Sequence, residues 1–205
     1  MIGLIGHKGE MCQIFDDRGV VRPVTAISVP DCIVVRKRTK DTDGYEAVQL
    51  GLGKISKRRS TKPTLGYFKK AGVEPRNVLM EFDVDKLDDF KVGQKIGVDG
   101  LKPGDKVMVS GITKGRGFTG GMKRWGWHGG NKTHGSTTHR RIGSLGSGTT
   151  PGRPLKGRTA AGHYGVERVT VRNLRVVKVE ADKGVIFVEG AVPGCRGGVV
   201  SVRKD

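Results

Sequence analysis

One stretch of 61 residues, 106–166, contains no Asp or Glu, although it holds 11 Lys or Arg and 16 of the chain's 34 glycines. Its apolar residues follow neither the two-residue period of a half-buried strand nor the 3.6-residue period of an amphipathic helix. A compact domain seldom holds so long a segment without regular structure unless the segment is functional or disordered. Missing acids and abundant glycine predict a backbone that passes close to a polyanion.

The charge of the whole chain points to the same partner. Its 205 residues carry a formal net charge of +18, from 38 Lys or Arg against 20 Asp or Glu. A pI near 10.2 is typical of proteins that bind nucleic acid. Membrane surfaces are also anionic, but they recruit basic amphipathic helices, and no such helix is indicated. We therefore expect nucleic acid as the partner, and neither a membrane nor a small-molecule substrate.

Outside this stretch, short runs rich in Val, Ile and Thr alternate with turn residues, which predicts a mainly β fold. Strands are expected at residues 2–5, 13–15, 21–29, 33–38, 45–50, 78–84, 106–112, 166–179, 185–188 and 199–203. One short helix is expected at residues 63–71, with Gly72 as its stop. Such close spacing favours a closed or packed antiparallel architecture. Residues 1–112 and 167–205 are predicted to form the body, and residues 113–166 an arm between two of its strands.

The cysteines and the N-terminus indicate an intracellular protein. Cys12, Cys32 and Cys195 are widely spaced and contain no C-x-x-C pair, so reduced thiols are expected rather than disulfides or zinc ligands. The N-terminus lacks the charged and apolar regions of a signal peptide. No apolar run reaches the roughly eighteen residues that a membrane helix needs.

Three patterns that could indicate a nucleotide site, a metal site or a catalytic nucleophile are each incomplete. Residues 115–120 fit G-x-G-x-x-G, but a dinucleotide site also needs a following helix and an acid about 20 residues on. No helix is expected at residues 122–130, and the next acid is Glu167. His128, His134 and His139 could ligate zinc, but no acid lies near them to orient a ring. No Ser or Cys has a base and an orienting acid nearby. We predict no enzyme, no cofactor and no metal site.

The candidate RNA-binding residues come from two segments. Residues 54–62 hold five cations in nine positions and form either a solvated loop or a phosphate-contacting one. In the arm, Trp125 and Trp127 either pack as a small cluster against the barrel or stack on unpaired bases. The predicted binding residues, all cationic or aromatic, are Lys54, Lys57, Arg58, Arg59, Lys62, Lys114, Arg116, Lys123, Arg124, Trp125, Trp127, His128, Lys132, His134, His139, Arg140, Arg141, Arg153, Lys156, Arg158 and His163.

Ten motifs, spread in order along nearly the whole chain, carry a resemblance to a known family. They are Met-Ile-Gly-Leu-Ile-Gly-His-Lys (1–8), Asp-Gly-Tyr-Glu-Ala-Val-Gln-Leu-Gly (43–51), Gly-Tyr-Phe-Lys-Lys-Ala-Gly-Val (66–73), Lys-Gly-Arg-Gly-Phe (114–118), Met-Lys-Arg-Trp (122–125), Thr-His-Gly (133–135), His-Arg-Arg-Ile-Gly-Ser-Leu-Gly (139–146), Thr-Pro-Gly-Arg (150–153), Ala-Gly-His-Tyr-Gly-Val-Glu-Arg-Val-Thr-Val (161–171) and Val-Glu-Gly-Ala-Val-Pro-Gly (188–194). With these motifs the chain resembles the bacterial-type large ribosomal subunit protein three family, the universal L-three family.

The resemblance implies a six-stranded Greek-key barrel of the translation-protein type, with a smaller α+β part at about residues 54–100 and a long, basic, irregular extension. It also implies that the chain is a cytoplasmic, structural constituent of the large ribosomal subunit. Such a protein binds 23S-type rRNA directly and helps to nucleate subunit assembly. Large-subunit proteins fourteen and nineteen are the implied neighbours. A free-standing nucleic-acid chaperone is the alternative, followed by an RNA-modifying enzyme.

The family's extension runs through large-subunit RNA toward the peptidyl-transferase centre. Its tip corresponds to residues 143–152, so the resemblance implies that four residues lie nearest that centre: Ser147, Gly148, Thr149 and Thr150. Some bacterial members carry a methylated glutamine near the tip. Thr149 stands there in this chain, so that modification is not expected.

Overall fold

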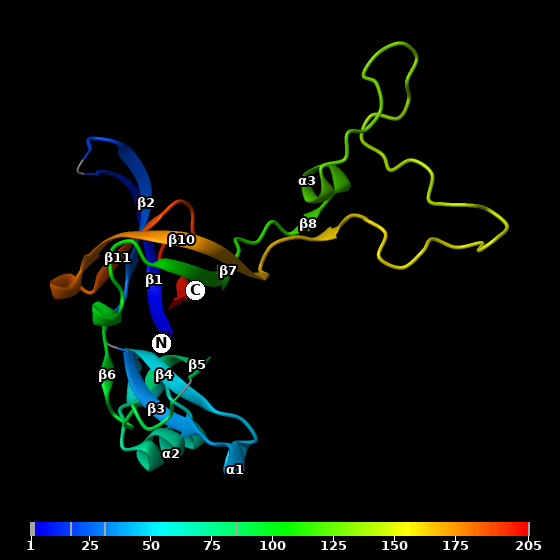
Figure 1. Ribbon diagram of the computed structural model, residues 1–205. Coiled ribbons are helices and arrows are strands. Elements are labelled where there is room, and N and C mark those ends of the chain that lie inside the picture. Colours follow the sequence, from blue (N-terminus) through cyan, green and yellow to red (C-terminus); the bar gives the residue numbers. More distant parts are fainter. Residues whose placement is uncertain (1–2, 17, 31, 85, 205) are drawn as a thin grey trace. The chain divides into compact units, whose positions relative to one another are not determined.

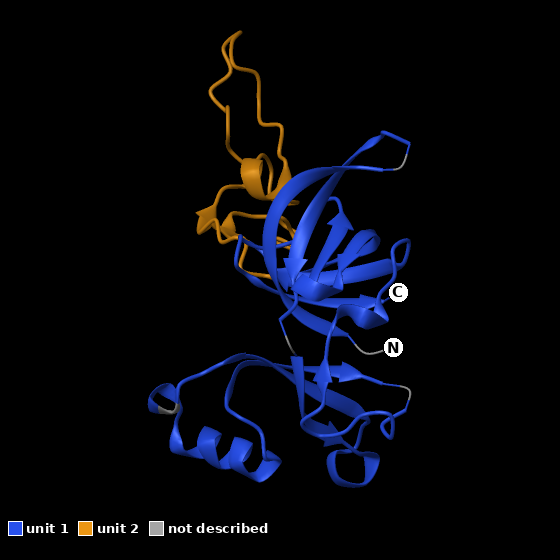
Figure 2. Ribbon diagram, turned by 90° about the vertical axis from the view of Figure 1, so that its left-hand side faces the viewer, with its two compact units in different colours: residues 1–113, 168–205 blue, residues 114–167 orange. Residues whose placement is uncertain are grey.

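The computed structural model describes residues 3–16, 18–30, 32–84 and 86–204, apart from the side chain of Lys57. Packing divides the chain into two compact units. Unit 1 comprises Met1–Thr113 and Arg168–Asp205, and unit 2 comprises Lys114–Glu167 (Figure 2). Unit 1 contains two sheets and nearly all of the buried apolar residues.

Six strands of unit 1 form one ring of antiparallel pairs in the order β1-β12-β7-β10-β11-β2, and β2 pairs back with β1 (Figure 1). Their bounds are β1 (Leu4–Phe15), β2 (Val21–Ser28), β7 (Lys106–Ile112), β10 (Arg168–Glu180), β11 (Val185–Glu189) and β12 (Val199–Lys204). Alternation directs the side chains: Val107 and Val109 of β7 are fully buried, whereas Met108 between them is partly exposed. Successive strand residues face opposite sides. The prediction of a mainly β protein is confirmed.

A second sheet of unit 1 has the order β5-β4-β3-β6. Its strands are β3 (Cys32–Arg38), β4 (Ala47–Lys54), β5 (Arg76–Asp83) and β6 (Lys95–Ile96), and the helices between them are α1 (Lys40–Asp43) and α2 (Lys62–Ala71). Single-turn 3-10 helices occur at η1 (Lys57–Arg59), η2 (Val98–Gly100) and, in the barrel, η3 (Ala181–Lys183). Helix α2 ends at Gly72, where φ is +67°, because glycine adopts this left-handed conformation without steric cost.

Two sequence-based boundaries differ from the structure. The smaller α+β part begins at Cys32 instead of residue 54, because β3 pairs with β4 and β4 with β5. A short β run does not reveal its pairing partner. The strands expected at residues 2–5 and 13–15 are one strand, β1, although residue 2 lies outside the described residues. The intervening residues 6–12 look unlike a strand, yet β1 pairs with β2 on both sides of a register shift between Lys8 and Met11.

The apolar core of unit 1 draws on both sheets. Ile5, Ile27 and Ile186 from the barrel and Leu50 and Phe82 from the second sheet belong to one buried cluster, and none is more than 1% exposed. Burial of each such side chain contributes about 1.5–3 kcal/mol. The Cys32 thiol is also buried and donates to the Ile5 carbonyl at 3.2 Å, whereas Cys12 and Cys195 are exposed. The core thus uses only residues outside unit 2.

A network of polar side chains links the strands of the second sheet. Arg38 Nη1 donates to Asp43 Oδ1 at 2.6 Å, and Arg38 Nε donates to Glu81 Oε1 at 3.1 Å. Tyr45 and Gln49 also donate to the Glu81 carboxylate, at 2.7 and 3.0 Å. Desolvation acts to raise the pKa of both carboxyls. For Asp43, hydrogen bonds from Arg38 and Thr42 and the charges of Arg36 and Arg38 outweigh it and leave the pKa below its ordinary value. For Glu81, the hydrogen bonds from Tyr45, Arg38 and Gln49 and the charge of Arg38 likewise leave the pKa below its ordinary value.

The network predicts a pH-dependent stability. Both carboxyls bind protons less tightly when folded, so their contribution is complete above the ordinary pKa values of 3.8 and 4.5 and is lost as the pH falls through and below them. Arg38→Gln should lower the melting temperature at about pH 7 and have a much smaller effect at about pH 3. The control is Lys40→Gln, which removes an exposed pair with Glu46 at 3.7 Å. An Arg38→Gln effect of equal size at both pH values would contradict this account.

Candidate nucleic-acid interface

The two ends of unit 2 are tied together by a short ribbon. Strand β8 (Phe118–Thr119) pairs with β9 (Gly162–His163). Beside this pair, Arg116 N–H donates to the Tyr164 carbonyl at 2.9 Å, and the Arg116 guanidinium lies 5.0 Å from the centre of the Tyr164 ring. Sequence periodicity did not reveal this ribbon, because two-residue strands are too short to show alternation. The arm therefore leaves and returns as one narrow stem.

Helix α3 (Gly121–Trp125) corrects the prediction that residues 122–130 contain no helix. It is a single turn: Arg124 N–H donates to the Gly120 carbonyl at 3.0 Å, and the turn ends at Gly126 with φ of +70°. Five residues are too few for an amphipathic period to appear in the sequence. The helix is also too brief to supply the extended helix of a dinucleotide fingerprint.

Both tryptophans pack within unit 2. Trp125 Nε1 donates to the Ala160 carbonyl at 2.8 Å, and Trp127 Nε1 donates to Thr159 Oγ1 at 3.3 Å. Arg124 also donates to the Ala160 carbonyl, at 3.0 Å, and its guanidinium lies 5.0 Å from the centre of the Trp125 ring. The tryptophans thus form a small cluster with partners in the arm itself. Trp125 remains 49% exposed, so part of its ring is open to a base.

Gly121 is required by this cluster. A Cβ at Gly121 would lie 2.0 Å from the Trp127 ring, whereas a Cβ at Gly120 meets nothing within 4 Å. Gly121→Ala should therefore displace the Trp127 indole toward solvent and shift tryptophan emission to longer wavelength. Because the chain's two tryptophans both lie in unit 2, the emission reports on this unit alone. Gly120→Ala is the control; an unchanged Gly121→Ala spectrum, or the same shift in both variants, would refute the prediction.

Beyond the tryptophans, the arm has little internal support. No backbone N–H of residues 131–161, all of them described, donates to another backbone carbonyl. Two local contacts close loops. Gly130 N–H donates to the His139 carbonyl at 3.3 Å, and His139 Nδ1 lies 2.9 Å from the Asn131 carbonyl oxygen. The Arg158 guanidinium donates to the Ser144 carbonyl. Most side chains of this segment are exposed, including the predicted tip residues 147–150. Apart from the Gly146 N–H, which donates to Ser144 Oγ at 3.3 Å, the described backbone donors of this segment are therefore available to an external partner.

The predicted binding residues fall into both units. Residues 114–166 hold ten cations and no acid, so no carboxylate of the arm can neutralise them. The predicted arm residues are all exposed apart from Arg124 and Trp127, which are half-buried. In unit 1, Arg58, Arg59 and Lys62 are exposed, and the side chain of Lys57 lies outside the described part. Lys54 forms an ion pair with Glu74 at 2.8 Å.

The arginines of β10 are not among the binding residues predicted from the sequence. Arg168, Arg172 and Arg175 are exposed, and the described residues show no ion pair for any of them. They interrupt the valines of a strand, so they resemble the ordinary outward positions of a barrel. Their lack of carboxylate partners is visible only once the strands are paired.

The described residues contain no group of three His, Cys, Asp or Glu close enough to hold a metal ion. Among the same residues, no helix is both long and apolar enough to cross a membrane. His128, His134 and His139 lie along an exposed loop of the arm.

Comparison with known proteins identifies the family. A family model described as ribosomal protein L3 matches residues 79–185. The chain is 52% identical over 202 residues to the large ribosomal subunit protein uL3 of Pelotomaculum thermopropionicum, covering 98% of this chain and 96% of that one. The uL3 proteins of Petrotoga mobilis and Thermotoga petrophila are 46% and 50% identical, covering 100% and 98% of this chain and 95% and 96% of theirs. The resemblance found in the motifs is confirmed: the chain belongs to the ribosomal protein L3 family.

Proposed function

We propose that this chain is a structural constituent of the large ribosomal subunit in the cytoplasm and binds large-subunit rRNA through unit 2. The relatives at about half identity are named as large ribosomal subunit proteins, and membership of this family means a structural ribosomal component and not an enzyme. The rRNA contact is the finer part of the proposal. It is supported by the chemistry of the arm.

One observation carries the rRNA proposal: an exposed, acid-free arm in which no N–H of residues 131–161 donates to a backbone carbonyl. Its ten cations repel one another, and residues 131–161 donate no backbone–backbone hydrogen bonds that could offset the repulsion. Phosphates provide both a counter-charge for Lys and Arg and acceptors for free N–H groups. Folded RNA also offers unpaired bases to the exposed face of Trp125.

The same proposal includes the bounds of the arm and the position of its tip in the subunit. Residues 113–166 are the proposed rRNA-penetrating extension, and the bounds of unit 2, Lys114–Glu167, support that division. The exposed residues 147–150 are proposed to lie nearest the peptidyl-transferase centre. We assign the closed ring of six strands to the Greek-key barrel of the translation-protein type. Large-subunit proteins fourteen and nineteen remain the proposed neighbours, and nucleation of subunit assembly the proposed role.

Sedimentation tests membership of the particle. A structural ribosomal protein remains with large subunits after a high-salt wash, because it is enclosed by RNA that folded around it. A free-standing nucleic-acid chaperone would be released by the same wash. Release of most of the chain would therefore refute the proposal.

Arg140 and Arg141, both exposed in the arm, test the contact itself. Arg140→Ala and Arg141→Ala should each weaken rRNA binding and lower the slope of log affinity against log salt, by about 0.7–0.9 for each phosphate that is no longer neutralised. The control is Lys183→Ala, which removes an exposed cation paired with Glu180 at 3.1 Å. Unchanged slopes would remove both arginines from the interface.

A further inference from the structure

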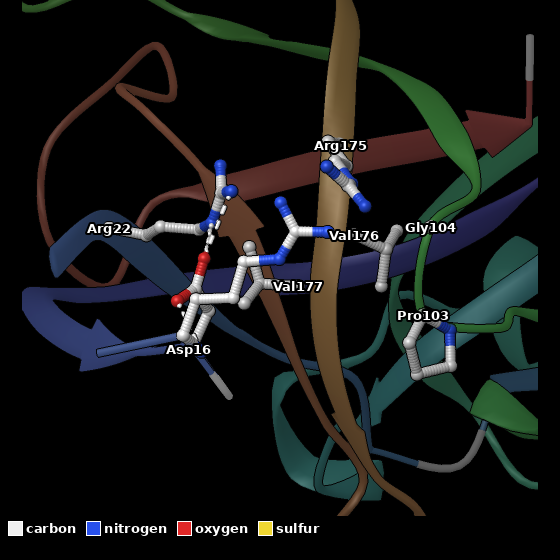
Figure 3. Close-up of a pocket in the computed structure, with 8 residues that line it drawn as sticks. Asp16, Arg22, Pro103, Gly104, Arg175, Val176 and Val177 are labelled. Atoms are coloured by element: carbon white, nitrogen blue, oxygen red, sulfur yellow. Dashed lines mark hydrogen bonds and ion pairs between the residues drawn. The ribbon is translucent and has the colours of Figure 1, made fainter. Parts of the chain in front are cut away.

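A hollow of about 430 Å³ lies in unit 1, between β10, the β1–β2 turn and the turn that precedes β7 (Figure 3). Three arginines and one acid contribute to its lining, which comprises Asp16, Arg18, Arg22, Pro103, Gly104, Arg175, Val176 and Val177. Gly104 N–H donates to the Val176 carbonyl at 2.8 Å, and Val176 N–H donates to the Asp105 carbonyl at 2.9 Å. These two bonds hold the 103–105 turn against β10, so one wall of the hollow is fixed by backbone.

One of the arginines is already neutralised. Arg22 Nε donates to Asp16 Oδ2 at 3.1 Å, and Arg22 Nη1 donates to Glu189 Oε1 at 3.0 Å. The other oxygen of Asp16 accepts the backbone N–H groups of Arg18 and Val20, at 3.0 and 2.9 Å. Both oxygens of Asp16 therefore already accept hydrogen bonds, one from the backbone of the β1–β2 turn and the other from Arg22. Neither is bonded to the Arg18 guanidinium.

Within the described residues, the remaining cations form no ion pair with an acid. Arg18 and Arg175 are exposed, and the described residues show no ion pair for either. Lys106 lies directly opposite Arg175 in the β7–β10 ladder, and residues opposite each other in an antiparallel pair point to the same face. Asp105, beside Lys106, is bonded to Lys204 Nζ at 2.8 Å and to the Lys102 N–H at 3.0 Å. Like charges in this arrangement destabilise a sheet.

We propose that Arg18, Arg175 and Lys106 form an oxyanion site on the barrel that takes a backbone phosphate of rRNA. A phosphate between these side chains would cancel the repulsion between Lys106 and Arg175 and could bond to an arginine in bidentate fashion. The assignment to RNA rests on the proposed function, since rRNA surrounds such a protein with phosphates. The site lies outside the arm and the 54–62 segment, and so adds a separate contact.

The test compares two double variants that remove the same charge. Arg18→Gln/Arg175→Gln removes both arginines that line the hollow. Lys86→Gln/Lys91→Gln removes two exposed cations of the loop between β5 and β6, neither of which lines it. With a large-subunit rRNA transcript, the first variant should lower the salt slope by about 0.7–0.9, and the second should leave it unchanged. Equal slopes for the first variant and the wild type, or an equal decrease in both variants, would overturn the site.

Inorganic phosphate provides a second readout on the free protein. At matched ionic strength, phosphate should raise the melting temperature of the wild type above its value in chloride, and Arg18→Gln/Arg175→Gln should abolish the increase. In chloride, Arg175→Gln should not lower the melting temperature, because it removes a repulsive pair; a marked decrease would count against the site. Phosphate stabilisation with an unchanged rRNA slope would reject RNA as the ligand. Failure of the wild type to bind rRNA would instead refute the proposed function, because the phosphate readout does not depend on it.

Discussion

Replacing residues 114–166 by a short glycine linker is expected to lower the affinity for large-subunit rRNA by about 10³-fold or more at moderate salt. The replaced segment holds ten of the chain's 38 Lys and Arg and no acid. Six to ten phosphate contacts typically account for changes of about 10³–10⁵-fold over a modest range of salt. The salt slope should fall in parallel, because fewer counterions are released on binding.

The shortened chain should still fold. Arg168 of β10 is paired with Ile112 of β7, and Val169 with Gly111, so Thr113 and Glu167 lie close enough for a few residues to join them. The core cluster contains no residue of unit 2. Far-UV circular dichroism should therefore retain the β signal and a cooperative melt. Affinity within a few-fold of the full chain, measured on a folded sample, would contradict the assignment of binding to the arm.

Phe82→Ala is expected to reduce the free energy of unfolding of unit 1 by about 3–5 kcal/mol. Phe82 lies on β5, is 1% exposed and belongs to the core cluster. Its ring fills the space beside Gly3, where a Cβ would come within 2.1 Å of it, and the Arg203 guanidinium lies 5.0 Å from its centre. Truncation removes apolar burial and leaves a cavity. The decrease is a large part of the roughly 5–15 kcal/mol that stabilises a typical domain.

Phe118→Ala is the matched control, because Phe118 lies in unit 2 and is 81% exposed. It should change the unfolding free energy by no more than about 0.5 kcal/mol. Urea denaturation followed by circular dichroism is the suitable measurement, since tryptophan emission reports only on unit 2. A Phe82→Ala effect as small as that of the control would show that the second sheet does not share the core with the barrel.

Much of the secondary structure could be predicted because it depends on local pattern. Strand β7 has the predicted bounds, and α2 with its stop at Gly72 begins one residue before the predicted start. Local pattern does not show which strands pair with each other. The sequence of β3 and β4 resembles the barrel strands, and only their hydrogen bonds place them in the second sheet. The single turn of α3 was missed for a related reason, since five residues cannot display a helical period.

The candidate interface could likewise be predicted only in part. Its position in the chain could be predicted, because the absence of acids over residues 106–166 is a property of composition. The contacts of individual side chains could not, because they depend on residues distant in sequence. Lys54 looks like a free cation until Glu74 is found 2.8 Å away. Conversely, Arg175 looks like an ordinary strand residue until Lys106 is placed opposite it.

Hydrogen exchange on the free and rRNA-bound protein tests most directly the claim that RNA orders the arm. Residues 131–161 donate no backbone–backbone hydrogen bonds, so in the free protein their amides should exchange almost as fast as in an unfolded chain, while the core strands stay protected. Binding to large-subunit rRNA should slow exchange across the same residues. Strong protection of residues 131–161 in the free protein, or rates that do not change on rRNA, would contradict the account.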